Sequence, residues 1–280
     1  MLDQAAELRN LVYRTAQDKS RSAEIVPHIA VFSGGKGGVG VSTLAVSIAM
    51  ALVDHGLRVV LVDVDLYRAD IAPLCNLSER GHVGDILSAR RDIHEVLERG
   101  PGGILVVPGV WAPDHEIPFS QHAQQRLLKQ VRSLGRHADM VLMDTGSSSV
   151  DKLHRFWRAA DEIVLVTTPD SMAVMDCYAT VKAASASGVV PGLIRLIVNK
   201  ASSPEQAADV HRRIEQSAKR FLGQRILSLG SVPDDARVAD ATREKNPAVL
   251  TTPSSPIFTP LQTLATVLVA STPLAAKVAA

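Results

Sequence analysis

A glycine-rich stretch near the N-terminal end constrains this chain more than any other feature of its sequence. An apolar, β-rich run from Ile29 to Ser33 leads into Gly34-Gly-Lys-Gly-Gly-Val-Gly40, and an apolar helical pattern follows from Ser42. Glycines let the backbone curl so that successive N–H groups converge on an anion, and the helix N-terminus adds its positive end. A strand, a glycine-rich turn and a helix in this order are the context of a phosphate-binding loop. A glycine-rich turn without a ligand is the alternative, and it leaves the polar residues at later strand ends unexplained.

The loop departs from the usual phosphate-loop pattern at one position. Gly35, Gly40 and Ser42 satisfy G-x-x-x-x-G-K-[ST], but Val41 stands where the lysine is expected. A lysine occurs earlier instead, at Lys36. The loss of the later lysine removes a cation from the β- and γ-phosphates, where charge must be stabilised during phosphoryl transfer. We therefore expect hydrolysis to suffer more than nucleotide binding.

Composition limits the class of protein. With 280 residues, 46% of them apolar and 21% charged, the chain suits one large α/β domain or two small ones. A net charge of +1 gives no general bias toward nucleic acid or acidic lipid, and no nucleic-acid partner is expected. Cys75 and Cys177 are isolated and are expected to be small buried hydrophobes in a reducing compartment. Without a signal-peptide pattern or an apolar run of about 18 residues, a cytoplasmic protein is expected.

Strand-like and helix-like patterns alternate from Ile29 onward. After the first strand we expect strands at 58–63, 104–107, 140–143, 163–167, 193–198 and 225–229. Helices are expected at 121–134, 171–187, 204–221 and from about 256. This alternation predicts an α/β fold with a mostly parallel twisted sheet and helices on both faces. The predicted organisation is a helix at 1–16, a flexible linker at 17–27, the α/β domain at 28–270 and a tail at 271–280.

Polar residues stand where several predicted strands end. Asp63 and Asp65 follow the second strand, Asp144 ends a later one, and Asn199 with Lys200 ends another. Ligands of open parallel sheets bind outside the carboxyl ends of the strands, so we expect these side chains to converge near the loop. A single aspartate there is more simply explained as a cap of the next element. A pair placed one strand after a phosphate loop favours a functional role.

Taken together, the motifs resemble the MinD/ParA ATPases, whose deviant loop carries an early signature lysine as well as the usual one. The similarity lies in Lys36-Gly-Gly-Val-Gly40, Val62-Asp-Val-Asp65, Met143-Asp-Thr-Gly146 and Val166-Thr-Thr-Pro-Asp170. Within that family the sequence is most similar to the FlhG subgroup of flagellar number and placement regulators. Shared with that subgroup is Arg220-Phe-Leu-Gly223 followed by Leu229-Gly-Ser-Val-Pro-Asp234. The resemblance covers residues 28–270 and implies a single-domain P-loop NTPase of the SIMIBI/MinD-like class.

The same resemblance implies a ligand set, ATP or ADP with Mg²⁺, and a role for individual residues. Ser42 would ligate Mg²⁺, Asp144 would hold it through water, and Asp63 would complete the shell. Asp65 would orient the attacking water, and Lys36 would reach the partner's phosphates in an ATP-dependent homodimer. Thr43 would contact the α-phosphate, Asn199 would read the adenine edge, and Pro233 with Asp234 would line the base. The implied nucleotide-binding positions are Gly35, Gly37, Gly38, Val39, Gly40, Val41, Ser42, Thr43, Asn199, Pro233 and Asp234.

The N-terminal segment resembles a partner-binding motif of the FlhG subgroup. Asp3-Gln-Ala-Ala-Glu-Leu-Arg9 is similar to the D-Q-A-x-x-L-R segment with which those proteins bind and stimulate FlhF, a GTPase related to the signal recognition particle. Asp3, Gln4, Leu8 and Arg9 are the contacts that this implies. Because isolated short helices are marginal in water, we expect the segment to order on its partner.

Two classes of function stay open. In the first, the protein is a switch in which ATP drives dimerisation and hydrolysis resets it. In the second, it is a pseudo-ATPase adaptor or a localisation protein of the CpaE/TadZ type that binds nucleotide without significant hydrolysis. Lys36, Asp65 and Asp144 favour the switch, whereas Val41 favours the adaptor. Arg68, where the subgroup has a small segment, is either a replacement cation or a solvated loop residue.

Other relatives of the family fit the sequence less well. Iron–sulfur members present cysteines to a cluster, and this chain has only two isolated ones. A ParA-like DNA segregation role is disfavoured because no basic patch is evident. The basic amphipathic membrane helix of MinD-like proteins matches residues 261–280 poorly, since Lys277 is their sole base and Pro273 interrupts them. Packing of this segment on the core is at least as well supported, and weak peripheral association with the inner membrane face, at a cell pole, stays an alternative.

Overall fold

A central β-sheet organises the part of the chain that the computed structural model describes. The described residues are 26–66, 68–78, 80–110, 119–147, 150–190, 192–270 and 272–278. The predicted N-terminal helix, including Asp3, Gln4, Leu8 and Arg9, and nearly all of the predicted linker lie outside them.

The sheet has eight strands in the order β3-β4-β2-β5-β1-β6-β7-β8. Their bounds are β1 (His28–Gly34), β2 (Val59–Asp63), β3 (Glu98–Arg99), β4 (Leu105–Val107), β5 (Met140–Asp144), β6 (Glu162–Thr167), β7 (Ile194–Ala201) and β8 (Ile226–Pro233). The short edge strand β3 is antiparallel to β4, and the other pairings are parallel. Both faces of the inner strands are covered, which is why β2 and β5 are continuous apolar runs.

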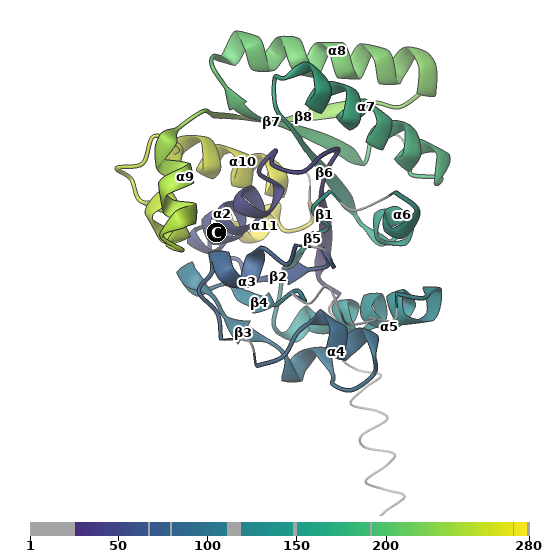
Figure 1. Ribbon diagram of the computed structural model, residues 1–280, viewed down its shortest axis with the longest axis vertical. Coiled ribbons are helices and arrows are strands. Elements are labelled where there is room, and N and C mark those ends of the chain that lie inside the picture. Colours follow the sequence, from purple (N-terminus) through teal and green to yellow (C-terminus); the bar gives the residue numbers. More distant parts are fainter. Residues whose placement is uncertain are drawn as a thin grey trace, which may run out of the picture.

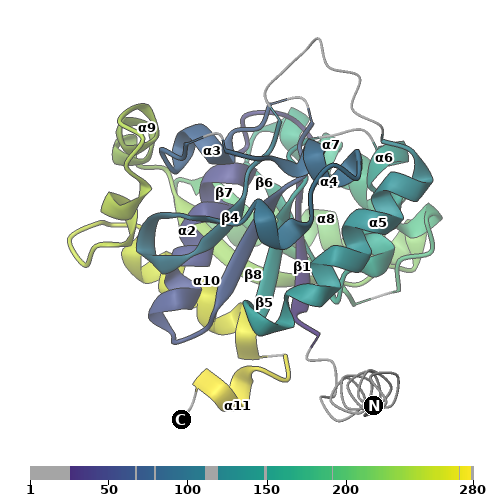
Figure 2. The same cartoon turned by 90° about the horizontal axis from the view of Figure 1, so that it is seen from below.

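Helices cover the two faces of the sheet. They are α2 (Val41–Asp54), α3 (Ile71–Leu74), α4 (Val83–Leu87), α5 (Gln121–Arg132), α6 (Val150–Ala159), α7 (Ser171–Ala186), α8 (Pro204–Leu222), α9 (Ala236–Arg243), α10 (Phe258–Ala270) and α11 (Ala275–Val278). Short 3₁₀ turns occur at η1 (Ile93–Glu95), η2 (Pro101–Gly103), η3 (Ser133–Arg136) and η4 (Pro247–Thr251). Apolar residues of α2, α3 and α10 form the core on one face, and those of α4 to α8 form it on the other (Figures 1 and 2).

Local sequence signals fix where the long helices begin and end. Ser203 caps α8 by accepting a hydrogen bond from the Gln206 amide at 3.2 Å, and Pro204 follows at the first helical position. At the other end Gly223 takes the left-handed conformation that terminates helices. Asp170 caps α7 by accepting from the Met172 and Ala173 amides. Helix α2 is buried along most of its length because α10 packs on the side that faces away from the sheet.

The predicted α/β fold is confirmed, and the strands and helices predicted from Ile29 onward occur with small shifts at their ends. The largest shifts lengthen β7 to Ala201 and β8 to Pro233, which extends both strands toward the loop. The pattern did not predict α3, α4, α6, α9 or the two-residue β3. The C-terminal helix α10 packs on the core through Leu261, Leu264 and Leu268, in line with the packing alternative. No helix in the described ranges is long and apolar enough to cross a membrane.

The C-terminal segment is tied to the sheet by a charged cluster at Asp139. Arg58 Nη2 donates to Asp139 Oδ1 at 2.8 Å, and Lys277 Nζ donates to Oδ2 at 2.6 Å. Burial alone would raise the pKa of Asp139, but the hydrogen bonds from Arg58 and Lys277 outweigh it and hold the pKa below its ordinary range. This carboxylate therefore stabilises the folded chain while it is ionised.

We expect Asp139→Asn to lower the free energy of unfolding at pH 7 by about 1–2 kcal/mol, since it weakens charge-assisted hydrogen bonds at a site that is 8% exposed. A pKa depressed in the folded state gives stability that is present above the unfolded pKa of about 3.9 and is lost as pH falls below it. Urea unfolding should thus show that the difference in free energy of unfolding between wild type and Asp139→Asn becomes smaller as the pH falls from 7 to 3. Asp209→Asn, which breaks an exposed pair with Arg212, is the control and should change stability little. A difference independent of pH would contradict the expectation.

Candidate nucleotide-binding site

The glycine-rich loop connects the end of β1 at Gly34 to the start of α2 at Val41. Gly38 and Gly40 have φ values of 84° and 94°, in the left-handed region that favours glycine. Asn199, near the end of β7, donates from its side-chain Nδ2 to the Val39 carbonyl oxygen at 2.9 Å. The loop is therefore shaped by its own glycines and held from one side by the predicted strand-end residue.

Two glycines of the loop also lie where no side chain fits. A Cβ on Gly35 would collide with the backbone of Asp176 and Cys177 in α7. A Cβ on Gly40 would lie 2.5 Å from Asn199 Nδ2. The first glycine thus lets α7 approach the loop, and the second leaves room for the Asn199 amide.

Asp63 and Asp144 lie side by side at the carboxyl ends of β2 and β5, where they are paired in register. Asp63 is fully buried, and its two oxygens accept hydrogen bonds from the amides of Asp65 at 3.0 Å and Ile71 at 3.2 Å. Burial raises its pKa well above the ordinary value, and the adjacent Asp144 raises it further. Asp63 therefore shapes the segment that carries Asp65, and its place in a Mg²⁺ shell stays a prediction.

Asp144 has an oxygen suited to a cation. Its Oδ1 accepts from the Gly146 amide at 2.8 Å, whereas Oδ2 is buried without a hydrogen-bond partner in the described part of the chain. Burial raises the pKa of Asp144 to about 6, and the nearby Ser42 hydroxyl counteracts this. A buried carboxylate oxygen beside a hydroxyl fits Mg²⁺, which binds hard oxygen ligands.

The protein groups do not form a complete metal cage. Among the described residues no set of three or more His, Cys, Asp or Glu side chains could hold a metal ion by itself. Mg²⁺ typically uses one or two carboxylates together with substrate phosphates and water. The donor set of Ser42 and Asp144 therefore fits a Mg²⁺ that arrives with a nucleotide, for which it would supply charge neutralisation at the phosphates.

Asp65 lies at the mouth of the same site and is 5% exposed. Gly146, at the end of the Asp144-Thr-Gly motif, has a φ of 55°, and a Cβ there would overlap the Asp65 carboxylate. The glycine therefore allows the β5 loop and the β2 loop to meet. Asp65 therefore lines the same cavity as Ser147 and the loop, and its role in orienting water stays a prediction.

A buried polar network beneath the loop was not predicted from the sequence. Ser33 Oγ and Thr145 Oγ1 are 2.6 Å apart, Trp157 Nε1 donates to Ser33 Oγ at 3.1 Å, and Thr145 Oγ1 donates to the Phe32 carbonyl at 2.8 Å. Thr145 belonged to a quoted motif, but Trp157 is on α6, whose helical pattern was not recognised. The network fixes the end of β1 against β5 and α6.

The early lysine forms an ion pair within its own chain. Lys36 Nζ lies 3.1 Å from Asp170 Oδ2, and both side chains are substantially exposed. Asp170 also caps α7, so the pair links the phosphate loop to the start of that helix. The predicted contact of Lys36 with a partner's nucleotide stays a prediction.

Val41 directs its side chain into the protein. It is 6% exposed and belongs to the hydrophobic core around α2. One of its methyl groups lies 2.7 Å from the position that a Cβ on Gly34 would take, which places it at the base of the loop. The residue that replaces the usual lysine thus fills apolar space and supplies no charge to a phosphate.

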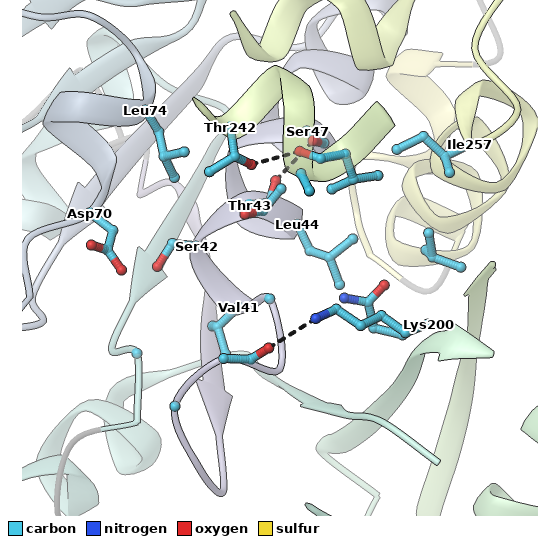
Figure 3. A pocket seen from close by; sticks show the side chains of 18 of the residues that line it. Val41, Ser42, Thr43, Leu44, Ser47, Asp70, Leu74, Lys200, Thr242 and Ile257 are labelled. Carbon is cyan, nitrogen blue, oxygen red and sulfur yellow. Dashed lines mark hydrogen bonds between the residues drawn. The ribbon is translucent and has the colours of Figure 1, made fainter. Parts of the chain in front are cut away.

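A cavity of about 630 Å³ opens above the loop. Apart from Gly35 and Val39, the predicted nucleotide-binding positions line it, together with Lys36 and Asp65. Ser42 and Thr43 lie at the start of α2, and Lys200 extends toward the loop beside Val41 (Figure 3). Pro233 and Asp234, at the end of β8, form part of the wall. The convergence predicted from the strand ends is therefore observed.

Other lining residues were absent from the predicted site, although Arg68 had been considered as a replacement cation. Arg68, after β2, contributes to the wall near the carboxylates, and Ser147 follows the β5 motif. Val238 and Thr242 of α9, with Leu74 of α3, line the far end of the cavity. Their positions depend on short helices that carry no clear pattern in the sequence.

Comparison with known proteins agrees with this geometry. Residues 24–269 match the family described as ParA, NUBPL iron-transfer P-loop NTPase. The chain belongs to the ParA family of P-loop NTPases. Among curated ParA-family relatives, the antiactivator FleN of Pseudomonas aeruginosa is 29% identical over 217 residues, covering 78% of this chain and 77% of FleN. The flagellum site-determining protein YlxH of Helicobacter pylori is 26% identical, covering 78% of this chain and 73% of YlxH.

A solved ParA-family structure shares the fold. The septum site-determining protein MinD of Pyrococcus horikoshii, determined with Mg-ADP, has a TM-score of 0.71 at 22% identity. The superposition covers 86% of this chain and 96% of the MinD chain.

The two cysteines lie on opposite faces of the sheet. Cys75 lies in the hydrophobic core on the α2 face of the sheet, and Cys177 lies in the core on the opposite face. Burial raises the pKa of each thiol to about 12. The two cysteines of the sequence therefore cannot ligate one cluster within this chain, as their isolated spacing predicted.

Proposed function

We propose that this ParA-family protein is an FlhG-like nucleotide switch that binds ATP with Mg²⁺ and regulates the number or placement of flagella. One observation carries the proposal: Asp144, whose buried Oδ2 has no hydrogen-bond partner among the described residues, lies near the Ser42 hydroxyl, and Ser42 lines a cavity walled by the glycine loop. The names of two relatives support the biological role, since FleN is called an antiactivator and YlxH a flagellum site-determining protein.

The residues divide the work of the switch as follows. The loop amides and the positive end of α2 hold the phosphates, and Ser42 with Asp144 holds Mg²⁺. Asp65 orients the water that attacks the terminal phosphate. Asn199, Pro233 and Asp234 surround the base. Lys36 exchanges its ion pair with Asp170 for the phosphates of a second copy when ATP brings two copies together.

The test is calorimetry of the full chain with ATP and with ADP, in the presence and absence of Mg²⁺, with phosphate release measured on the same sample. We expect both nucleotides to bind, ATP with a dependence on Mg²⁺, and phosphate release to be slow. If neither nucleotide binds at millimolar concentration, the switch is not the function of this protein.

Val41 specifically favours a second function. Because it buries an apolar side chain where a phosphate-binding cation is usual, the protein would act as a pseudo-ATPase adaptor that binds ATP and presents its N-terminal segment without turnover. Tight ATP binding with no phosphate release, alone or with partners, would favour the adaptor over the switch.

The partner that we propose is an FlhF-like GTPase, recognised through Asp3, Gln4, Leu8 and Arg9. Full-length protein should stimulate the GTPase, whereas a chain that starts at Val26 should not. Leu8→Asp should lose binding and stimulation together because it places a charge on the apolar side of the segment. Gln4→Ala should lose stimulation more than binding, since a polar side chain near the GTPase site would act on water or phosphate. Equal stimulation by the full-length and shortened chains, in steady-state GTP hydrolysis, would rule this partner mode out.

A further inference from the structure

Two cations from outside the loop reach it from neighbouring segments. A Cβ on Gly37 would lie 3.2 Å from Nη1 of Arg68, which follows β2. Lys200, near the end of β7, donates from Nζ to the Gly38 carbonyl oxygen at 3.3 Å. Both side chains line the same cavity as the loop (Figure 3 shows Lys200). The loop is thus approached by positive charge although its own lysine position is apolar.

The backbone at Lys200 is held in an unusual conformation. Its φ is 56°, in the left-handed region, and the pairing of β7 with β8 shifts register between Val198 and Ala201. A side chain in this region costs free energy and persists where the surrounding structure over-determines it, often at ligand sites. Here Asn199 and Lys200 reach two successive loop carbonyls, those of Val39 and Gly38. The distortion therefore directs both side chains at the loop.

Arg68 approaches the loop from the segment that follows β2. Its Nε faces Asp70 Oδ2 at 3.7 Å, and its side chain is 58% exposed. The guanidinium extends past this partner to Gly37, and Gly37 also lies close to Ser147, beside Asp65. Arginine presents several donors in a planar fork that suits phosphate oxygens.

A polyphosphate needs cations at this site. The carboxylates that line the cavity are Asp65, Asp70, Asp234 and Asp235. Of the lining cations, Lys36 is paired with Asp170, and Lys245 follows the end of α9. Without compensation, this distribution would repel a nucleotide triphosphate. We propose that Arg68 and Lys200 together bind the nucleotide phosphates and replace the loop lysine that Val41 lacks. This inference rests on the proposed nucleotide binding and names the residues that make it possible.

The first test compares Arg68→Ala, Lys200→Ala and the double variant with wild type by calorimetry with Mg-ATP and with adenosine. Each single change should weaken ATP binding about 10-fold, and the double change more, because each removes a charge-assisted contact. Adenosine, which has no phosphate, should bind all four proteins equally. Lys219→Ala on the exposed end of α8 is the matched control and should bind ATP as wild type does.

Charge-preserving variants separate phosphate binding from loop support. Arg68→Lys and Lys200→Arg should recover most of the ATP affinity if charge matters. An equal loss of ATP and adenosine binding, or a loss that the charge-preserving variants share, would assign both residues to loop structure and overturn the proposal.

A lysine restored at position 41 gives a second, independent readout. If Arg68 and Lys200 stand in for the missing lysine, Val41→Lys should raise ATP affinity more in the Arg68→Ala/Lys200→Ala background than in wild type. Equal gains in both backgrounds would contradict the replacement. If wild type binds ATP and the Arg68 and Lys200 variants bind it with the same affinity, only this inference is wrong. If wild type binds no nucleotide, the proposed function is wrong as well.

Discussion

Gly40→Val is expected to abolish the binding of ATP and ADP. The φ of 94° strains any side chain at this position, and a Cβ would lie 2.5 Å from the Asn199 amide that holds the Val39 carbonyl. The branched valine would also occupy the space that a phosphate must enter. Calorimetry with Mg-ATP should therefore detect no binding up to millimolar concentration.

The control for this change is Gly188→Val. Gly188 has a φ of 82° and nothing within 4 Å of an added Cβ, so it carries a comparable backbone strain away from the site. Both variants should lose stability, Gly40→Val more because its Cβ meets Asn199, and each kcal/mol lost should lower Tm by about 2–4 °C for a domain of this size. Gly188→Val should bind ATP normally. Nucleotide binding that survives in Gly40→Val would mean that the loop does not receive the phosphates.

Val41→Lys is expected to raise the rate of ATP hydrolysis by about 10²–10³-fold, the usual effect of one group that stabilises transition-state charge. Val41 packs in the core around α2 but also lines the cavity, so a longer and flexible side chain at this position can extend toward the phosphates. Single-turnover phosphate release, measured with protein in saturating excess over nucleotide, separates this effect from a change in affinity.

Val41→Met is the matched control because methionine has similar length without charge. It should leave hydrolysis near the wild-type rate and confirm that volume alone is not responsible. A lysine variant that binds ATP with an unchanged rate would show that charge at this position does not limit turnover. The limiting step would then lie with Asp65 or with dimerisation.

Site residues could be predicted from the sequence where they lie at the ends of regular strands. Asp63 and Asp144 could be placed together because parallel strands present their carboxyl ends at one edge, and the two residues are indeed register partners. The loop, Ser42 and Asn199 followed from the same rule. These positions are determined by strand alternation and strand length, both of which are visible as apolar runs.

The remaining parts of the site depend on geometry that is not periodic. Lys200 was expected near the loop, but the left-handed backbone and the register shift that direct it at the Gly38 carbonyl leave no pattern in the sequence. Arg68 was noticed as a cation but its direction was undetermined, because the segment after β2 ends in the four-residue helix α3. Helix α9 lines the cavity with Val238 and Thr242, but its one buried residue is the small Ala241, so it carries little apolar signal in the sequence.

The buried indole of Trp157 provides an intrinsic fluorescence signal that can report on the loop. This ring is 1% exposed and donates to Ser33, one residue before the loop begins, while Ser33 contacts Thr145 beside the Asp65 segment. Indole emission responds to changes in local polarity and hydrogen bonding, so a rearrangement of the loop would alter the fluorescence without any attached dye. Trp111, the second tryptophan of the sequence, lies outside the described residues and can be exchanged for phenylalanine to leave one emitter. Stopped-flow mixing with unlabelled nucleotide would then follow events at the loop in real time.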